Sequence, residues 1–221
     1  MAAAACGHTG TVSVWAIVVA AGSGTRFGGA KQFVRLGGLP SVDRAAAAAG
    51  EVCDGVVVVV PAGHGWRPPS GVVSVAGGAT RSESVRAGLA AVPEDAEIVV
   101  VHDAARPLAS IALFSAVIAE VRRGADAAVP ALAVVDTVKR VEAGRVIETV
   151  ERDGLYTVQT PQAFRAGALR KAHAGGAHGT DDAALVEAMG GTVLVVEGDA
   201  RNVKVTVAAD VEMLDALLGE R

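Results

Sequence analysis

Three apolar runs constrain the fold of this chain more than any other feature of its sequence. Strands are expected over residues 14–20, 56–60 and 97–101, because each segment is almost uninterruptedly apolar, as in strands that are covered on both faces. Segments with helical spacing of apolar residues separate them, and strands that alternate with helices imply βαβ units. The sequence therefore predicts an α/β, Rossmann-like fold: an open, mostly parallel twisted sheet with helices on both faces.

The remaining elements follow from the same patterns. Further strands are expected over residues 72–75, 127–135 and 192–196, and helices over residues 41–49, 81–92, 111–121, 166–172, 181–189 and 209–218. Charged and apolar residues alternate over residues 138–150 around Ala143 and Gly144, which predicts a β-hairpin arm. No repeat and no Pro/Ser-rich linker divides the chain, so we expect a flexible leader over residues 1–13 and a single domain over residues 14–221.

Composition and charge argue against several classes of function. The chain has 221 residues, of which 51% are hydrophobic and 20% charged, as in a globular domain. A net charge of −4 and 3% aromatic residues argue against a duplex-DNA binder and a single-strand stacking platform, so no nucleic-acid partner is expected. No apolar run approaches the roughly 18–20 residues that span a bilayer, so no membrane partner is expected. Cys6 and Cys53 lack metal-ligand spacing, which favours two free thiols in a reducing cytoplasm.

Ligands of open α/β sheets bind outside the carboxyl ends of the strands, where three loops are expected here. The first, residues 20–32, is Gly-rich and carries Arg26 and Lys31, a combination suited to binding phosphate through main-chain N–H groups and cations. It is not a Walker A loop, because Gln32 follows the lysine, nor a dinucleotide fingerprint, because Phe27 occupies the place of the third glycine. The alternative is a merely flexible turn.

The second loop, residues 77–84, carries a double glycine that enters a helix. It could offer main-chain donors to an anion at the positive helix end, or its polar residues Thr80 and Ser82 could simply cap the helix. The third loop, residues 101–107, holds Asp103 at the end of a strand, where its carboxylate could face a ligand or a magnesium ion. A surface ion pair between this aspartate and an arginine is the alternative there.

Two smaller assignments follow from residue type and position. His102 stands beside Asp103, and we assign it a structural role. The Thr180–Asp181 pair stands at the start of a predicted helix, where such a pair usually acts as a cap.

Taken together, these residues resemble the methylerythritol phosphate cytidylyltransferases of non-mevalonate isoprenoid synthesis. The matching stretches occur in the order of that family, and they are residues 20–26, 31–33, 77–78 with Arg81 and Ser84, 101–107, 136–139, 152–155, 160–162, 180–182 and 202–206. The resemblance implies transfer of CMP from CTP to 2-C-methyl-D-erythritol 4-phosphate, with release of pyrophosphate and with magnesium (Mg2+) as the cofactor. Ala30 departs from a usual proline of the family, and Ala79 departs from a common acidic residue.

The resemblance also implies the role of each site residue. The cations expected to hold the CTP phosphates and stabilise the transition state are Arg26, Lys31 and Lys204. The residues expected around cytosine and ribose are Ala20, Ala21, Gly22, Gly78, Ala79 and Ser84. The residues expected on the polyol-phosphate side are Asp103, Arg106, Thr137, Arg152, Thr160, Thr180 and Thr206. Magnesium would be held mainly by the CTP phosphates with Asp103 as a protein ligand, and Arg152 would act across the interface of a cytoplasmic homodimer.

Three alternatives stay open at this point. Another polyol phosphate, such as ribitol phosphate, could replace methylerythritol phosphate, because related enzymes share the nucleotide loops. A nucleotide-dependent dehydrogenase fits the βαβ pattern but lacks its fingerprint. A non-catalytic nucleotide-binding module would bind CTP without releasing pyrophosphate.

Overall fold

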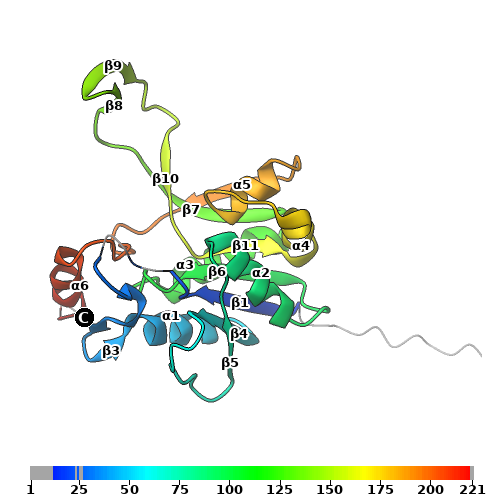
Figure 1. The fold of residues 1–221 in the computed structure, drawn as a ribbon. Coiled ribbons are helices and arrows are strands. Elements are labelled where there is room, and N and C mark those ends of the chain that lie inside the picture. The colour runs from blue at the N-terminus through cyan, green and yellow to red at the C-terminus, as the bar shows by residue number, and fades with distance from the viewer. Residues whose placement is uncertain (1–11, 23, 25–26, 220–221) are drawn as a thin grey trace, which may run out of the picture.

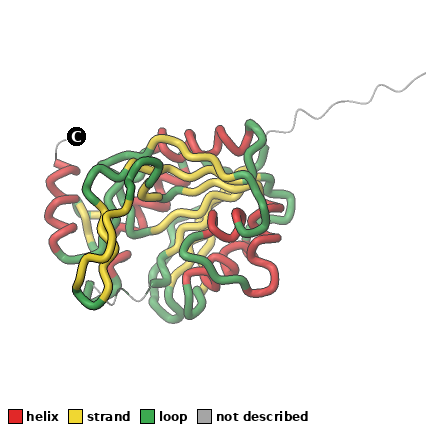
Figure 2. The backbone as a smooth tube through the Cα atoms, turned by 90° about the horizontal axis from the view of Figure 1, so that it is seen from above, coloured by secondary structure: helices red, strands yellow, loops and turns green. Residues whose placement is uncertain are grey.

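The computed structural model describes residues 12–22, 24 and 27–219, and its centre is an eight-stranded sheet with helices packed on both faces (Figure 1, Figure 2). The strands are β1 (Val14–Val19), β2 (Arg35–Leu36), β3 (Leu39–Pro40), β4 (Gly55–Val60), β5 (Val72–Ala76), β6 (Ile98–Asp103), β7 (Ala127–Ala133), β8 (Val138–Glu142), β9 (Arg145–Val150), β10 (Tyr156–Val158), β11 (Gln162–Arg165) and β12 (Val193–Glu197). The helices are α1 (Ser41–Gly50), α2 (Arg81–Ala91), α3 (Ile111–Arg122), α4 (Ala166–His173), α5 (Asp182–Glu187) and α6 (Ala209–Gly219), with short 3-10 turns η1 (Lys31–Phe33) and η2 (Ala174–Gly176).

The order of strands in the sheet confirms the predicted class. The sheet runs β10-β7-β11-β6-β1-β4-β5, and β12 also pairs with β7. The β6-β1-β4-β5 half is wholly parallel, and β12 is parallel to β7. The strands β10 and β11 are antiparallel, and the sequence did not predict them. The expected helix over residues 181–189 is shorter, because Asp181 caps it and α5 ends at Glu187.

Two apolar cores lie on opposite faces of the sheet, which explains the uninterrupted apolar runs. Along β1, the side chains of Ala16 and Val18 enter one core, and the side chain of Ile17 enters the other. The first core is completed by α1 and α3, and the second by α2, α4 and α5. Since every β1 side chain meets protein on either face, the strand can be apolar throughout.

Strand register brings the functional loops to one edge. Val19 of β1 pairs with Asp103 of β6 and with Val59 of β4, and Val60 pairs with Ala76 of β5. The loops after β1, β5 and β6 therefore leave the sheet at its carboxyl edge, as predicted.

A hairpin of β8 and β9 forms the predicted arm. Val138 pairs with Val150, and the hairpin projects away from the body of the molecule (Figure 1). Residues 1–11 of the expected leader lie outside the described residues. The carbonyl oxygen of Ser13 accepts hydrogen bonds from the N–H groups of Glu97 and Ile98, so this residue, expected to end the leader, is bonded to the start of β6.

Two helical glycines give a matched test of how tightly α2 packs on the sheet. A Cβ at Gly88 in α2 would lie 2.5 Å from Cγ2 of Ile17, whereas a Cβ at Gly167 in α4 would meet no atom within 4 Å. Gly88→Ala should therefore lower the free energy of unfolding by about 1–3 kcal/mol despite its better helix propensity. Gly167→Ala should leave it unchanged or raise it by up to about 1 kcal/mol. Urea denaturation of both variants checks this, and equal effects would contradict the packing described here.

Candidate active site

A cavity of about 400 Å³ opens at the carboxyl ends of β1 and β6. The Gly-rich loop with η1, the start of α2 and the segment after β12 form its wall. The predicted site residues that line it are Ala20, Ala21, Gly22, Lys31, Gly78, Ala79, Ser84, Asp103, Lys204 and Thr206. The structure therefore brings together all of the residues predicted for cytosine and ribose and two of the three predicted cations. The third, Arg26, lies outside the described residues.

A second cavity of about 210 Å³ adjoins the first. It holds three more of the predicted residues, Arg106, Thr160 and Thr180. Three side chains line both cavities, namely Arg81, Asp103 and Lys204. The two cavities thus share a charged wall, and ligands bound in them would meet at this wall.

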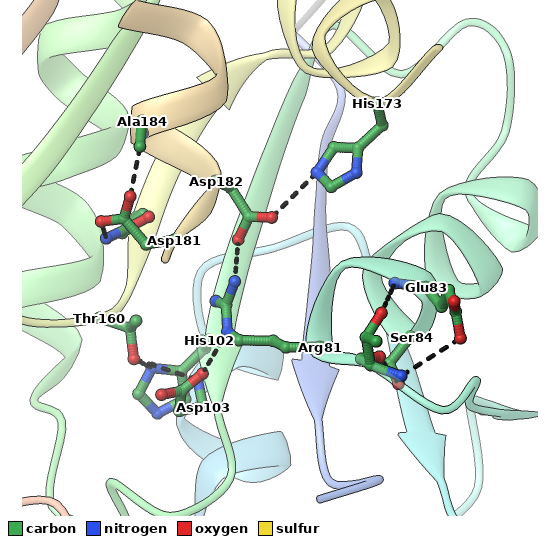
Figure 3. Close-up of polar contacts among 12 residues, drawn as sticks. Arg81, Glu83, Ser84, His102, Asp103, Thr160, His173, Asp181, Asp182 and Ala184 are labelled. Carbon is green, nitrogen blue, oxygen red and sulfur yellow. Dashed lines mark hydrogen bonds and ion pairs between the residues drawn. The ribbon is translucent and has the colours of Figure 1, made fainter. Parts of the chain in front are cut away.

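Asp103 contacts both cations of the shared wall, and Figure 3 shows its contact with Arg81. Its Oδ2 lies 2.6 Å from Nζ of Lys204, and its Oδ1 lies 3.3 Å from Nε of Arg81. Burial alone would raise the pKa of this carboxyl, but the two cations outweigh burial and hold its pKa well below the ordinary value. The Lys204 side chain is still 41% exposed, so its ammonium group can also contact an anionic ligand.

Buried hydrogen bonds hold the backbone of Asp103 in place. The N–H of Asp103 donates to Oγ1 of Thr160 at 3.0 Å, and this hydroxyl contacts Nδ1 of His102 at 3.1 Å. The other ring nitrogen of His102 lies 3.1 Å from the carbonyl oxygen of Arg106, which can only accept, so Nε2 carries the proton and the Thr160 hydroxyl donates to Nδ1. His102 is fully buried and has the structural role that we expected. The Thr160 hydroxyl is already bonded to Asp103 and His102, and its contact with a substrate stays a prediction.

The segment that carries Lys204 is docked against the loop after β6. Arg106 donates through Nη1 to the carbonyl oxygen of Asn202 at 2.7 Å, and the N–H of Val205 donates to the carbonyl oxygen of Ala105 at 2.8 Å. The buried amide of Asn202 donates in turn to the carbonyl oxygen of Thr160 at 2.9 Å. These bonds hold residues far apart in sequence at one wall of the site.

The loop before α2 is a helix cap as well as a cavity wall. Thr80 and Glu83 form a capping box, in which the Thr80 side chain accepts from the N–H of Glu83. The Glu83 carboxylate accepts from the N–H of Ala79 at 2.7 Å and of Thr80 at 3.2 Å. The capping alternative is therefore confirmed for Thr80, and the N–H of Ala79 is already bonded to the Glu83 carboxylate.

Two of the predicted site residues lie away from both cavities. Thr137 and Arg152 line neither cavity, because they flank the exposed hairpin arm. The guanidinium of Arg152 donates to the carbonyl oxygen of Val135 at the base of the arm. The structure does not bring Thr137 to the cavities with the other residues predicted for the polyol phosphate, and the role of Arg152 across a dimer interface stays a prediction.

Metal ligands are sparse at the site. Within residues 12–219, apart from the undescribed positions, no three His, Cys, Asp or Glu side chains come together in a way that could hold a metal ion. Asp103 is the single carboxylate on the described wall of the first cavity, and both of its oxygens contact cations. A magnesium site made of protein ligands alone therefore does not fit these residues.

Arg81 is the main residue to which the sequence assigned no role. It is the first residue of α2, where a cation opposes the positive end of the helix dipole. A cation at this end of a helix is unfavourable on its own, so its presence there is a sequence signal for a carboxylate partner, from which the role of Arg81 could have been found. Gln32 is a second such residue, since it is buried and donates through Nε2 to the carbonyl oxygen of Gly22 at 3.0 Å, which fixes the Gly-rich loop.

Comparisons with known proteins show which family, relatives and solved structures this chain resembles. The sequence model of the 2-C-methyl-D-erythritol 4-phosphate cytidylyltransferase family (IspD) matches residues 14–220. The enzyme of that name from Nocardia farcinica is 48% identical over 95% of each chain. A bifunctional IspD/IspF enzyme from Anaeromyxobacter dehalogenans is 45% identical over 91% of this chain, which spans 56% of that relative. The crystal structure of the cytidylyltransferase from Thermus thermophilus superposes with a TM-score of 0.80 at 36% identity, covering 94% of this chain and 98% of the other.

His102 predicts how the stability of the fold depends on pH. Burial lowers the pKa of its imidazole from 6.5 to about 4, so between these values the unfolded chain binds a proton that the folded chain does not. Acidification from pH 7 to pH 4 should therefore lower the free energy of unfolding by about 3 kcal/mol through this residue. Urea denaturation across this range should show a steeper loss for the wild type than for His102→Asn. Parallel curves would contradict a neutral, buried His102.

Proposed function

The chain belongs to the 2-C-methyl-D-erythritol 4-phosphate cytidylyltransferase family, and we propose that its two adjoining cavities bind the two substrates of this activity. The enzyme transfers CMP from CTP to 2-C-methyl-D-erythritol 4-phosphate, which gives CDP-methylerythritol and pyrophosphate for isoprenoid precursor synthesis. The main support for this assignment is that both cavities share a wall of Arg81, Asp103 and Lys204. The phosphate oxygen that accepts CMP and the α-phosphate of CTP must come together at such a wall for the transfer to occur.

The first cavity is the proposed CTP site. Small residues and main-chain groups on its wall allow the nucleotide to approach the backbone closely. The residues proposed to surround cytosine and ribose are Ala20, Ala21, Gly22, Gly78, Ala79 and Ser84. Lys31 and Lys204 lie on the same wall and are proposed to hold the phosphates, together with Arg26.

The second cavity is the proposed polyol-phosphate site. Its wall combines the guanidinium of Arg106 and the hydroxyl of Thr180 with the ion pair of Asp103 and Lys204. Hydroxyl and carboxylate oxygens suit the polyol, and the cations suit its phosphate. Thr160 and Thr206 complete the proposed set.

The chemistry needs charge stabilisation more than it needs a base. The second pKa of a phosphate monoester is about 6, so the acceptor oxygen is largely ionised at neutral pH. This oxygen forms a bond to the α-phosphorus of CTP, and the bond from that phosphorus to the bridging oxygen of the β-phosphate breaks, so pyrophosphate leaves with the electron pair. Two anions must be aligned and negative charge builds up at the phosphorus, which fixed cations such as Lys204 stabilise.

We propose that magnesium enters the site with CTP. Mg2+ usually keeps several waters and is bound by one or two carboxylates together with substrate phosphates, which agrees with the single carboxylate on this wall. Bound in this way, it would neutralise phosphate charge. Asp103 as a protein ligand stays a prediction, because the metal would have to replace the contact of one oxygen with Lys204 or Arg81.

We propose that the enzyme is a homodimer in which the arm completes the partner's site. The arm exposes apolar side chains, with 61% of Val146 and 51% of Ile147 accessible. Thr137 and Arg152 flank this arm and line neither cavity of their own subunit, so in a dimer they could reach only another copy. The arm would therefore bury its apolar face and deliver a cation to the neighbouring polyol phosphate.

We propose the cytoplasm as the location of the enzyme, since its substrates are phosphorylated metabolites. None of the helices in the described part of the chain has both the length and the apolar character needed to cross a membrane.

Pyrophosphate release with two acceptors tests the function. Purified protein with CTP and Mg2+ should release pyrophosphate with methylerythritol phosphate and at a far lower rate with ribitol phosphate. Release with ribitol phosphate alone would favour the other polyol, and CTP binding without any release would indicate a non-catalytic module.

The same assay tests the proposed cations. Lys31→Ala should lower kcat by about 10²–10³-fold, the loss typical for one preorganised donor, with little change in the free energy of unfolding. A near-normal kcat would refute the assigned role of Lys31.

Mixed dimers test whether Arg152 acts across the interface. Arg152→Ala and Lys204→Ala should each be nearly inactive, but a mixture that has been unfolded and refolded together should regain about a quarter of wild-type turnover, because half of randomly paired two-fold dimers contain one intact site. Recovery disappears if the arginine serves its own subunit. Refolding each variant alone is the control, and analytical ultracentrifugation reports whether the dimer exists.

A further inference from the structure

A chain of three polar contacts runs from the shared wall into the interior (Figure 3). The guanidinium of Arg81 contacts Asp103 through Nε at 3.3 Å and Asp182 through Nη1 at 2.7 Å. The second carboxylate oxygen of Asp182 lies 2.9 Å from Nε2 of His173. The side chains of Asp182 and His173 are 1% and 2% exposed and line neither cavity, so these two residues cannot touch a substrate.

A gain in stability is a weak explanation for this chain of polar contacts. Removing a carboxylate and a guanidinium from water is costly, and well-packed apolar residues are often as stable as a buried ion pair. The four residues come from four elements, since Arg81 begins α2, Asp103 ends β6, Asp182 begins α5 and His173 ends α4. Two of the four residues, Arg81 and Asp103, belong to the wall between the cavities, and the contacts of Asp182 and His173 join that wall to α5 and α4.

The contact lengths show which carboxylate anchors Arg81. Its shorter contact is with Asp182, whereas the shortest contact of Asp103 is with Lys204 at 2.6 Å. The remaining nitrogen of the guanidinium, Nη2, is buried without a hydrogen-bond partner among the described residues, so the contacts of the guanidinium are those with Asp182 and Asp103. Without the charge of Asp182, Arg81 would turn toward Asp103 and compete with Lys204 for it.

We propose that Asp182, supported by His173, is a positioning residue of the transfer reaction. It holds Arg81 partly away from Asp103, so that Asp103 and Lys204 keep the arrangement that receives the polyol phosphate. Asp182 also follows Thr180 and Asp181, two residues of the second cavity, and its ion pair with Arg81 fixes that segment against α2. This inference rests on the proposed function and adds two buried residues to it.

Steady-state kinetics of Asp182→Asn test the proposal. We expect kcat/KM for methylerythritol phosphate to fall by about 10–100-fold, the size of effect that a small misplacement of reacting groups produces. The dissociation constant of CTP, measured by calorimetry without the polyol phosphate, should change by less than kcat/KM, because Lys31 and the proposed base and ribose contacts lie outside the chain of ion pairs. Unchanged kcat/KM, or an equal loss of CTP affinity, overturns the proposal.

A double-mutant cycle separates positioning from general destabilisation. If Asp182 acts through Arg81, the double variant Arg81→Gln/Asp182→Asn should have the same kcat/KM as Arg81→Gln alone. Multiplied losses would show that the two residues act independently and would refute the proposal.

A matched control and a milder variant complete the experiment. Arg86 also lies on α2 and donates to the carbonyl oxygen of Ala177 at 2.9 Å, but it lines neither cavity. Arg86→Gln should lower stability without changing kcat/KM, and a loss equal to that of Asp182→Asn would contradict a specific role. If Asp182→Asn does not fold, His173→Asn should show the same pattern more weakly, and wild-type kinetics there overturn the proposal. A wild type that releases no pyrophosphate would instead refute the proposed function.

Discussion

The position of one carboxylate between two cations determines what this site can do. Asp103 ends a central strand and contacts Lys204 and Arg81, which come from segments distant in sequence. Because the cations hold its pKa well below the ordinary value, this group stays charged and keeps both of them at the boundary of the two cavities. Alignment of two phosphorylated ligands depends on this boundary, since each ligand would meet the same ion pair from its own side.

The fold supports that carboxylate by parallel register and buried hydrogen bonds. Val19 and Asp103 lie level in adjacent strands, so the Gly-rich loop and the wall face each other. Behind the wall, His102 and Thr160 form a neutral pair that holds the backbone of Asp103. Several positions on the wall of the first cavity are alanine or glycine, and such small residues let a ligand approach the backbone closely.

Sequence reasoning predicted the parts that local patterns encode. The apolar runs that became β1, β4 and β6, the Gly-rich loop and the alternating arm are visible in short windows, and strand order alone then places the loops at one edge. The strand β11 was missed, because four residues with a polar start carry no apolar run of their own and become a strand only between β6 and β7. The ion pair of Arg81 with Asp182 was missed for a related reason, since it joins residues about a hundred positions apart. The roles of Thr137 and Arg152 came from the resemblance alone, because both residues flank the arm and line neither cavity.

A wall common to two cavities also has a stereochemical consequence. With the acceptor on one side and the nucleotide on the other, the proposed transfer needs a single in-line displacement and no covalent nucleotidyl-enzyme. Asp103, the carboxylate best placed to attack, has both oxygens engaged by cations. A nucleotide made chiral at its α-phosphorus would therefore emerge with inverted configuration.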